Sequence, residues 1–145
     1  MSSPGSTTKI DLSQLSTRDA LDLAILVEEE AKDRYLEFAD QMKAHRNDET
    51  RRFFEFMADN EEKHREALAA RRYDLFGTEA VRVSRGMIFD VEAPAYGEAR
   101  MFQTVREALQ TALRSEVKAF EFFTAALSQV TDPAARALFT ELCHE

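Results

Sequence analysis

The stretch Phe54-Glu55-Phe56-Met57-Ala58-Asp59-Asn60-Glu61-Glu62-Lys63-His64 places a Glu-x-x-His pair inside a helical pattern of apolar residues. At about 100° per residue, Glu61 and His64 fall on the apolar helix face that begins at Phe54. A carboxylate is too costly to bury without a partner, so this face needs a compensating cation. Carboxylate and imidazole ligands one helical turn apart suit a transition-metal ion. Taken alone, the stretch is also compatible with a core ion pair or an exposed Glu/His pair.

The composition is that of one globular domain. The chain has 145 residues, 44% hydrophobic and 32% charged, which is enough for a full core. A formal net charge of −8 argues against a nucleic-acid partner, because phosphate binding needs clustered Lys and Arg. The single cysteine, Cys143, excludes an internal disulfide and favours a reducing cytoplasm. No apolar run reaches the roughly 18 residues of a membrane span, and residues 1–15 are predicted to be a disordered lead-in.

Helical periodicity predicts four helices joined by one long connection. Capping-box patterns open the first helix at Ser16 and the third at Thr104, and Gly77 is expected to end the second. Residues 77–101 hold three of the four glycines and no amphipathic pattern, so they are predicted to cross over between two helical hairpins. The predicted helices cover about 17–44, 49–75 and 105–129, with a fourth starting at Asp132-Pro133.

An internal repeat relates the two hairpins. Residues 16–39 match residues 104–127 at a constant offset of 88, and this register sets Glu28 over Glu116. Each carboxylate is in line with apolar positions of its own helix, and both are therefore expected to face inward. The positions are 21, 24, 25 and 28 in the first helix, and 109, 112, 113 and 116 in the third.

The fourth helix repeats the second at an offset of 85. On that register the counterparts of Glu61 and His64 would lie one and four residues past Glu145. This register predicts a truncated fourth helix that stops before its own ligand pair. The alternative is that Glu141 and His144, which have the Glu-x-x-His spacing, supply the pair after a five-residue shift of the helix.

A bundle of this kind, with one Glu on each of two helices and Glu-x-x-His on the others, has the ligand arrangement of ferritin-like di-iron carboxylate proteins. The pattern predicts an all-α, antiparallel four-helix bundle with a long crossover between its second and third helices. Four residues are the candidate metal ligands: Glu28, Glu61, His64 and Glu116.

Over roughly residues 16–145 the chain resembles the rubrerythrins. The resemblance is carried by three motifs in order: Glu28-Glu29-Glu30-Ala31-Lys32-Asp33-Arg34-Tyr35, Phe54-x-x-Met57-Ala58-x-x-Glu61-x-x-His64 and Glu116-x-x-Ala119-x-x-Phe122-Phe123. It implies two iron ions, with Tyr35 as a hydrogen-bond partner beside the ligands. It also implies a ferroxidase or peroxidase that acts on ferrous iron with dioxygen or hydrogen peroxide, often as a homodimer or higher homo-oligomer.

Two departures from the rubrerythrins bear on this activity. Ala119 stands where the family usually carries an extra carboxylate, and Phe123 replaces a tyrosine. The rubredoxin domain is also absent, so a peroxidase would need a separate electron donor. These differences favour ferrous oxidation over peroxide turnover. A second hypothesis is an iron-binding module that passes iron to a storage shell or to a fused or partner transport domain.

Overall fold

The computed structural model describes residues 12–87 and 104–143 of the chain, and this part is almost entirely helical. No strand occurs among the described residues, which confirms the all-α prediction. Two short 3₁₀ turns, η2 and η3, accompany the four α-helices. The elements are η2 (Leu12–Gln14), α1 (Thr17–Ala44), α2 (Asp48–Phe76), η3 (Arg85–Met87), α3 (Val105–Leu127) and α4 (Pro133–Leu142).

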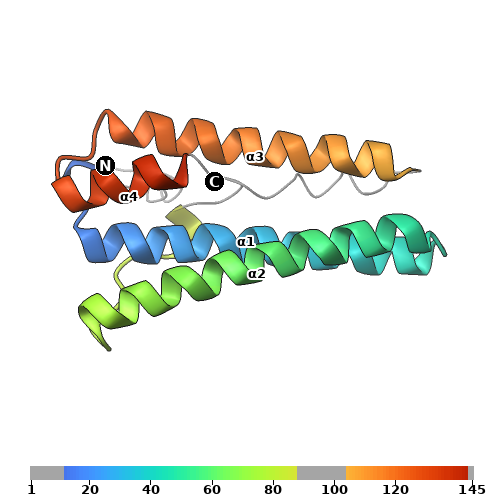
Figure 1. The fold of residues 1–145 in the computed structure, drawn as a ribbon, viewed down its shortest axis with the longest axis horizontal. Helices are drawn as coiled ribbons and strands as arrows, with labels where there is room; N and C mark the ends of the chain where they lie inside the picture. Colours follow the sequence, from blue (N-terminus) through green and yellow to red (C-terminus); the bar gives the residue numbers. More distant parts are fainter. Residues whose placement is uncertain (1–11, 88–103, 144–145) are drawn as a thin grey trace, which may run out of the picture.

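The four helices form a ferritin-like bundle in which α1 and α2 make the longest hairpin (Figure 1). α2 ends at one end of the bundle and α3 begins at the other, as the crossover prediction requires; residues 88–103 lie outside the described part. α3 then runs antiparallel to α1, and α4 turns back beside it. α4 has 10 residues against 29 in α2, so the α3–α4 side is shorter than the α1–α2 side.

Side chains predicted to cap the helices do so. The hydroxyl of Ser16 accepts a hydrogen bond from the backbone N–H of Asp19 at 3.1 Å, and that of Thr104 accepts one from Glu107 at 3.1 Å. Each bond satisfies a backbone donor that a helix start leaves without a partner. Gly77 ends α2 with a φ of 58°, in the left-handed region that glycine tolerates best.

The predicted disordered lead-in is too long by at least four residues. Residues 1–11 lie outside the described part, but η2 is ordered and Leu15 is buried in the core. The backbone carbonyl of Ser13 accepts a hydrogen bond from the Thr131 hydroxyl at 3.1 Å. Burial of one apolar side chain and this bond to the α3–α4 turn explain why the segment packs against the bundle.

Two apolar clusters make up the core, and a polar layer separates them. One cluster joins the first half of α1 to α4 and the end of α3. The other joins the second half of α1 to the starts of α2 and α3. On α1, Glu28 lies between Val27 of the first cluster and Ala31 of the second. On α2, Glu61 lies one turn after Ala58 of the second cluster. The predicted ligands on α1 and α2 are therefore placed at the middle of the bundle.

The inward face of α3 differs from the prediction. Its buried side carries small residues, whereas the leucines expected inside are exposed: Leu109 is 55% and Leu113 is 63% accessible. Small inner residues let the α3 backbone approach the other helices closely, and this packing outweighs the preference for burying leucine. The buried residues of α3 are Ala108, Thr111, Ala112, Ser115, Ala119, Phe123 and Ala126.

A buried arginine links the first residues after α2 to the bundle by hydrogen bonds. Arg72 on α2 donates two hydrogen bonds to the carboxylate of Asp22 on α1, at 2.8 and 3.2 Å. It donates two more to the carbonyl oxygens of Gly77 and Glu79, at 2.8 and 2.6 Å. Pairing of this kind offsets the cost of burying both charges. Arg72 thus holds α1, the end of α2 and the first residues after α2 together.

Candidate metal centre

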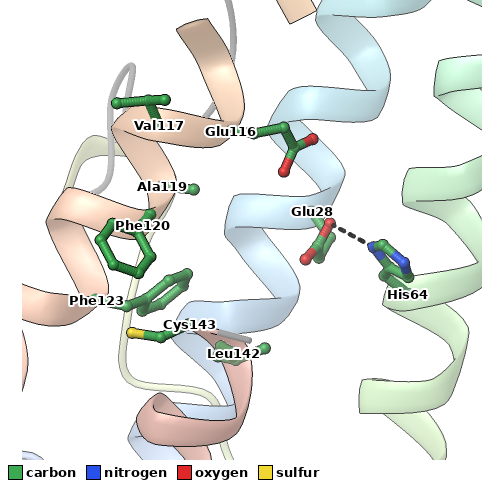
Figure 2. Close-up of a pocket in the computed structure, with 9 residues that line it drawn as sticks. All are labelled: Glu28, His64, Glu116, Val117, Ala119, Phe120, Phe123, Leu142 and Cys143. Atoms are coloured by element: carbon green, nitrogen blue, oxygen red, sulfur yellow. Dashed lines mark ion pairs between the residues drawn. The ribbon is translucent and has the colours of Figure 1, made fainter. Parts of the chain in front are cut away.

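Three of the four predicted ligands meet between α1 and α2. One ligand atom from each of Glu28, Glu61 and His64 lies within 4.8 Å of the others. His64 Nδ1 is 3.7 Å from Oε2 of Glu28 and 3.8 Å from Oε2 of Glu61. The spacing of Glu61 and His64 on α2 puts both on the side that faces α1. Figure 2 shows Glu28 of α1 extending toward His64.

The two carboxylates are buried and incompletely paired. Glu28 and Glu61 are only 6% and 1% accessible. Oε2 of each is buried with no hydrogen-bond partner among the described residues. Acceptors of this kind are costly to leave unsatisfied. These two oxygen atoms are the observation that best fits a cation-binding site, and an imidazole with two carboxylates is a donor set typical of iron, manganese or zinc.

Glu116 is placed differently from the other three candidates. The sequence pattern predicted that it faces inward, but the residue is exposed and lies at the edge of the buried face of α3. It nevertheless lines the same cavity as Glu28 and His64, and its carboxylate extends from α3 toward Glu28 (Figure 2). The prediction was wrong about burial, because the inner face of α3 is rotated toward Ser115 and Ala119.

The cavity between these residues has a volume of about 240 Å³. Its polar end is formed by Glu28, His64 and Glu116, and its other walls are mostly apolar. An apolar lining lowers the local dielectric and strengthens electrostatic contacts with a bound ion. The remaining lining residues are Val117, Ala119, Phe120, Phe123, Leu142 and Cys143.

The electrostatics of the metal-free cluster favour protons on two of its groups. Burial raises the pKa of Glu61 to about 8, and the adjacent Glu28 adds to the shift while His64 opposes it. The neighbouring carboxylates, Glu28 first and then Glu61, raise the pKa of His64 to about 10. At neutral pH, Glu61 and His64 both hold protons that a metal ion would have to displace.

The metal-free protein should become less stable as the pH rises from about 5 to 10. Glu61 and His64 have pKa values of 4.5 and 6.5 without these contacts, so the folded state binds more protons than the unfolded state across this window. Between pH 6 and 9 the midpoint of thermal unfolding should fall by roughly 4 °C or more, the shift that about 1 kcal/mol produces in a domain of this size.

Circular dichroism melts in the presence of a chelator measure this dependence. The variant Glu61→Gln should flatten it, whereas Glu66→Gln, an exposed neighbour on α2, should leave it unchanged. A melting midpoint that rises between pH 6 and 9 would contradict the assignment of protons to this cluster.

The other site candidates lie elsewhere. Glu141 on α4 forms an ion pair with Arg71 at 2.8 Å and is exposed, so it does not face the cluster, and His144 lies outside the described residues. The alternative ligand pair of Glu141 and His144 therefore stays a prediction. Cys143 lines the cavity, but its sulfur lies 3.6 Å from the hydroxyl of Thr124 on α3 and is directed away from Glu28 (Figure 2).

Tyr35 is fully buried on α1, two turns after Glu28. Its ring stacks on Phe54 with ring centroids 6.0 Å apart, so it packs on the residue that starts the α2 motif. Its role as a hydrogen-bond partner of the ligands stays a prediction.

An ion-pair network beside the site was missed by sequence reasoning. Glu62 accepts hydrogen bonds from Lys32 on α1 at 3.0 Å and from Arg65 at 2.8 Å. These cations, Arg65 first, hold the pKa of Glu62 well below its usual range. The spacing of Glu62 and Arg65 could have indicated the pair within α2, but nothing in the sequence indicated Lys32. The network ties α1 to α2 next to Glu61.

Comparisons with known proteins found one matching family model and one similar solved structure. Residues 19–145 match the sequence model of the family described as Rubrerythrin. The crystal structure of an uncharacterized conserved protein from Magnetospirillum magnetotacticum MS-1 superposes with a TM-score of 0.66 and 26% sequence identity. That match covers 89% of this chain and 85% of the other. No curated protein matches the sequence.

Proposed function

The chain belongs to the rubrerythrin family, and on that premise we propose that it is a di-iron oxidoreductase that oxidises ferrous iron with dioxygen or peroxide. The supporting observation is the pair of buried carboxylates of Glu28 and Glu61, which lie close to His64. The Oε2 atom of each has no hydrogen-bond partner among the described residues. Iron bound there would supply one-electron redox chemistry.

Each ligand contributes a distinct property to the proposed site. Glu28 and Glu61 would neutralise the charge of bound iron, and His64 would occupy a terminal position on it. Glu61 and His64 must release their protons as iron binds, so iron affinity should increase with pH. Phe120 and Phe123 would restrict water on the far wall of the cavity. Glu116 would add a third carboxylate from α3.

The experiment is anaerobic loading with ferrous iron followed by exposure to air. The proposal expects ferric absorbance to develop faster than in buffer and to remain with the protein. If iron binds but oxidises at the buffer rate, the oxidoreductase function is wrong and the binding function below replaces it.

The second candidate function is iron handling without fast turnover, in which bound iron passes to a storage shell or to a partner transport domain. The observation that favours it is the exposure of Glu116, which gives the cavity a carboxylate that solvent can reach. Transfer of ferrous iron to a chelator in competition with oxidation separates the two functions. As a peroxidase, the protein would instead need a separate electron donor.

We expect the chain to self-associate through the exposed apolar residues of α3, two of which, Val117 and Phe120, also lie at the rim of the cavity. Four large apolar residues lie exposed along that helix, between 46% and 63% accessible, and they form one face at helical spacing. The six charged residues of α3 sum to zero in a chain of net charge −8, so electrostatic repulsion between copies that meet there is small. The exposed residues are Leu109, Leu113, Val117 and Phe120.

Sedimentation velocity at micromolar concentration measures this association. The chain should sediment as a dimer or higher oligomer, and Leu109→Lys with Leu113→Lys should weaken association by roughly tenfold or more, since each apolar contact contributes on the order of 1 kcal/mol. Phe56→Lys, at an exposed site on α2, is the matched control. A wild-type monomer, or equal weakening by both variants, would contradict the assignment.

No helix in the described part of the chain combines the length and apolar content that a bilayer span requires.

A further inference from the structure

The cluster of Glu28, Glu61 and His64 draws on two helices, so its geometry depends on how α1 and α2 are held at that level. Glu28 lies on α1, whereas Glu61 and His64 lie on α2. Metal–ligand distances tolerate deviations of only about 0.2 Å, and one residue of helix advances about 1.5 Å. A small shift or rotation of one helix against the other would therefore separate the ligand atoms.

Two strong contacts between α1 and α2 lie at a distance from these ligands. Phe54 of α2 packs edge-on against Phe38 of α1, with ring centroids 5.3 Å apart. Arg72 of α2 pairs with Asp22 of α1 at 2.8 Å. On α2, both contacts lie about two helical turns from the nearest ligand, which is roughly 10 Å along the helix axis. They leave the level of the ligands to be held by other residues.

Small side chains flank the ligands on the side toward Phe54. Ala31 lies three residues after Glu28 on α1, and Ala58 lies three residues before Glu61 on α2. Both alanines are buried. Methyl groups let the helix backbones approach closely, but they interdigitate little and so do little to fix the rotation of one helix against the other.

The ion pair of Lys32 and Glu62 joins the two helices at this level. Lys32 lies one turn after Glu28 on α1, and Glu62 directly follows Glu61 on α2. Nζ of Lys32 donates a hydrogen bond to Oε1 of Glu62 at 3.0 Å. Arg65 donates one to each oxygen of the same carboxylate, both at 2.8 Å, which fixes its orientation. Both side chains of the pair are partly buried, so salt screens it only in part.

We infer that Lys32 and Glu62 are positioning residues of the candidate metal centre. Their ion pair holds α1 and α2 at the separation and rotation at which the ligand atoms of Glu28, Glu61 and His64 converge. The pair acts through the helix backbones rather than by contact with the ion. The inference rests on the metal-binding part of the proposed function.

The charge of Lys32 distinguishes positioning from a simple electrostatic effect. Removal of this lysine takes a positive charge away from a cation site, and by Coulomb attraction alone this would tighten metal binding. Loss of positioning would weaken metal binding instead. The direction of the change therefore identifies its cause. Thermal stability should change little, because a partly exposed ion pair contributes little to folding.

Calorimetric titration of the metal-free chain with Co²⁺, with visible absorption at saturation, tests the inference. Lys32→Gln should weaken Co²⁺ binding roughly tenfold, the lower end of the range for an outer contact to a metal site, and should change the absorption band of the bound ion. Lys32→Arg should restore both, since arginine can still pair with Glu62. The control is Lys63→Gln, which removes the same charge from an exposed position between Glu62 and His64 and should not weaken binding.

A double variant tests whether Lys32 acts through Glu62. Lys32→Gln combined with Glu62→Gln should bind Co²⁺ no more weakly than Glu62→Gln alone, because the first substitution has no further contact to remove. Affinity losses that add in the double variant would overturn the inference. Co²⁺ affinity in Lys32→Gln at or above that of the wild type, or equal weakening by Lys63→Gln, would also overturn it.

The outcome is separable from the fate of the oxidoreductase function, because Co²⁺ binding requires no iron oxidation. The expected variant pattern without catalysed ferrous oxidation would support the positioning role and reject the oxidoreductase function. Catalysed ferrous oxidation with Co²⁺ affinity unchanged in Lys32→Gln would do the reverse. A wild-type chain that binds no Co²⁺ would overturn the positioning role and the metal site together.

Discussion

Replacing Glu61 by alanine should abolish iron binding while leaving the metal-free bundle folded. Glu61 is 1% accessible, and its Oε2, like that of Glu28, is buried with no hydrogen-bond partner among the described residues. Its loss removes a ligand and half of the negative charge that Glu28 and Glu61 together bring to the cluster. Because even an outer contact to a metal ligand is worth roughly 10- to 100-fold in affinity, removal of the ligand itself should exceed that range.

The same substitution should not lower the thermal stability of the metal-free chain at pH 8. A buried carboxyl group whose pKa is raised to about 8 costs free energy when it ionises, and removing it offsets the cavity that alanine leaves. Iron content by plasma emission spectrometry and melting curves in chelator measure the two effects. Glu66→Ala, exposed on α2, is the control. Undiminished iron in Glu61→Ala would remove Glu61 from the ligand set.

Replacing Glu116 by alanine should abolish the catalysed part of ferrous oxidation. Reduction of dioxygen to peroxide takes two electrons, and two ferrous ions in one cavity can supply the pair, whereas one ion supplies a single electron. Glu116 is the carboxylate that α3 contributes to the cavity. Without it, the rate of ferric formation should fall to that of buffer.

Stopped-flow absorbance of ferric formation measures the rate, with Glu121→Ala as the control on the same helix. Peroxide consumption with an artificial electron donor should be slow beside it, because Ala119 offers no carboxylate that could replace His64 on iron when the oxidation state changes. Fast peroxide consumption together with buffer-like ferrous oxidation would reverse this preference and make the protein a peroxidase.

Local sequence signals were sufficient for the helix ends and for the α1–α2 half of the candidate site. Ser16, Thr104 and Gly77 act at the positions predicted for them, because capping depends on a few neighbouring residues. Glu28 and Glu61 are buried as expected, since a charged residue in an apolar stripe indicates the face that packs. Helix caps and buried helix faces both depend on residues that lie close together along one helix, so the sequence alone is enough to predict them.

The orientation of α3 depends on a choice that periodicity cannot make. Its leucines and its small residues form adjacent faces, and hydrophobicity alone favours burial of the leucine face. The structure buries Ala112, Ser115 and Ala119 instead, because close backbone approach requires small side chains. Glu116 consequently lies at the rim. The bonds of Arg72 to Asp22 and to two carbonyl oxygens were missed for a related reason, since they join residues far apart in the sequence.

The methyl group of Ala119 on the cavity wall also has an evolutionary consequence. Alanine and glutamate codons differ at the second base, so a single nucleotide change can introduce a carboxylate at this position when the third base is a purine. Because Ala119 lies one turn from Glu116 on the same helix and lines the cavity, the new group would lie beside the existing carboxylate. Under the proposed function, a single mutation would then separate a protein that favours ferrous iron from one suited to peroxide.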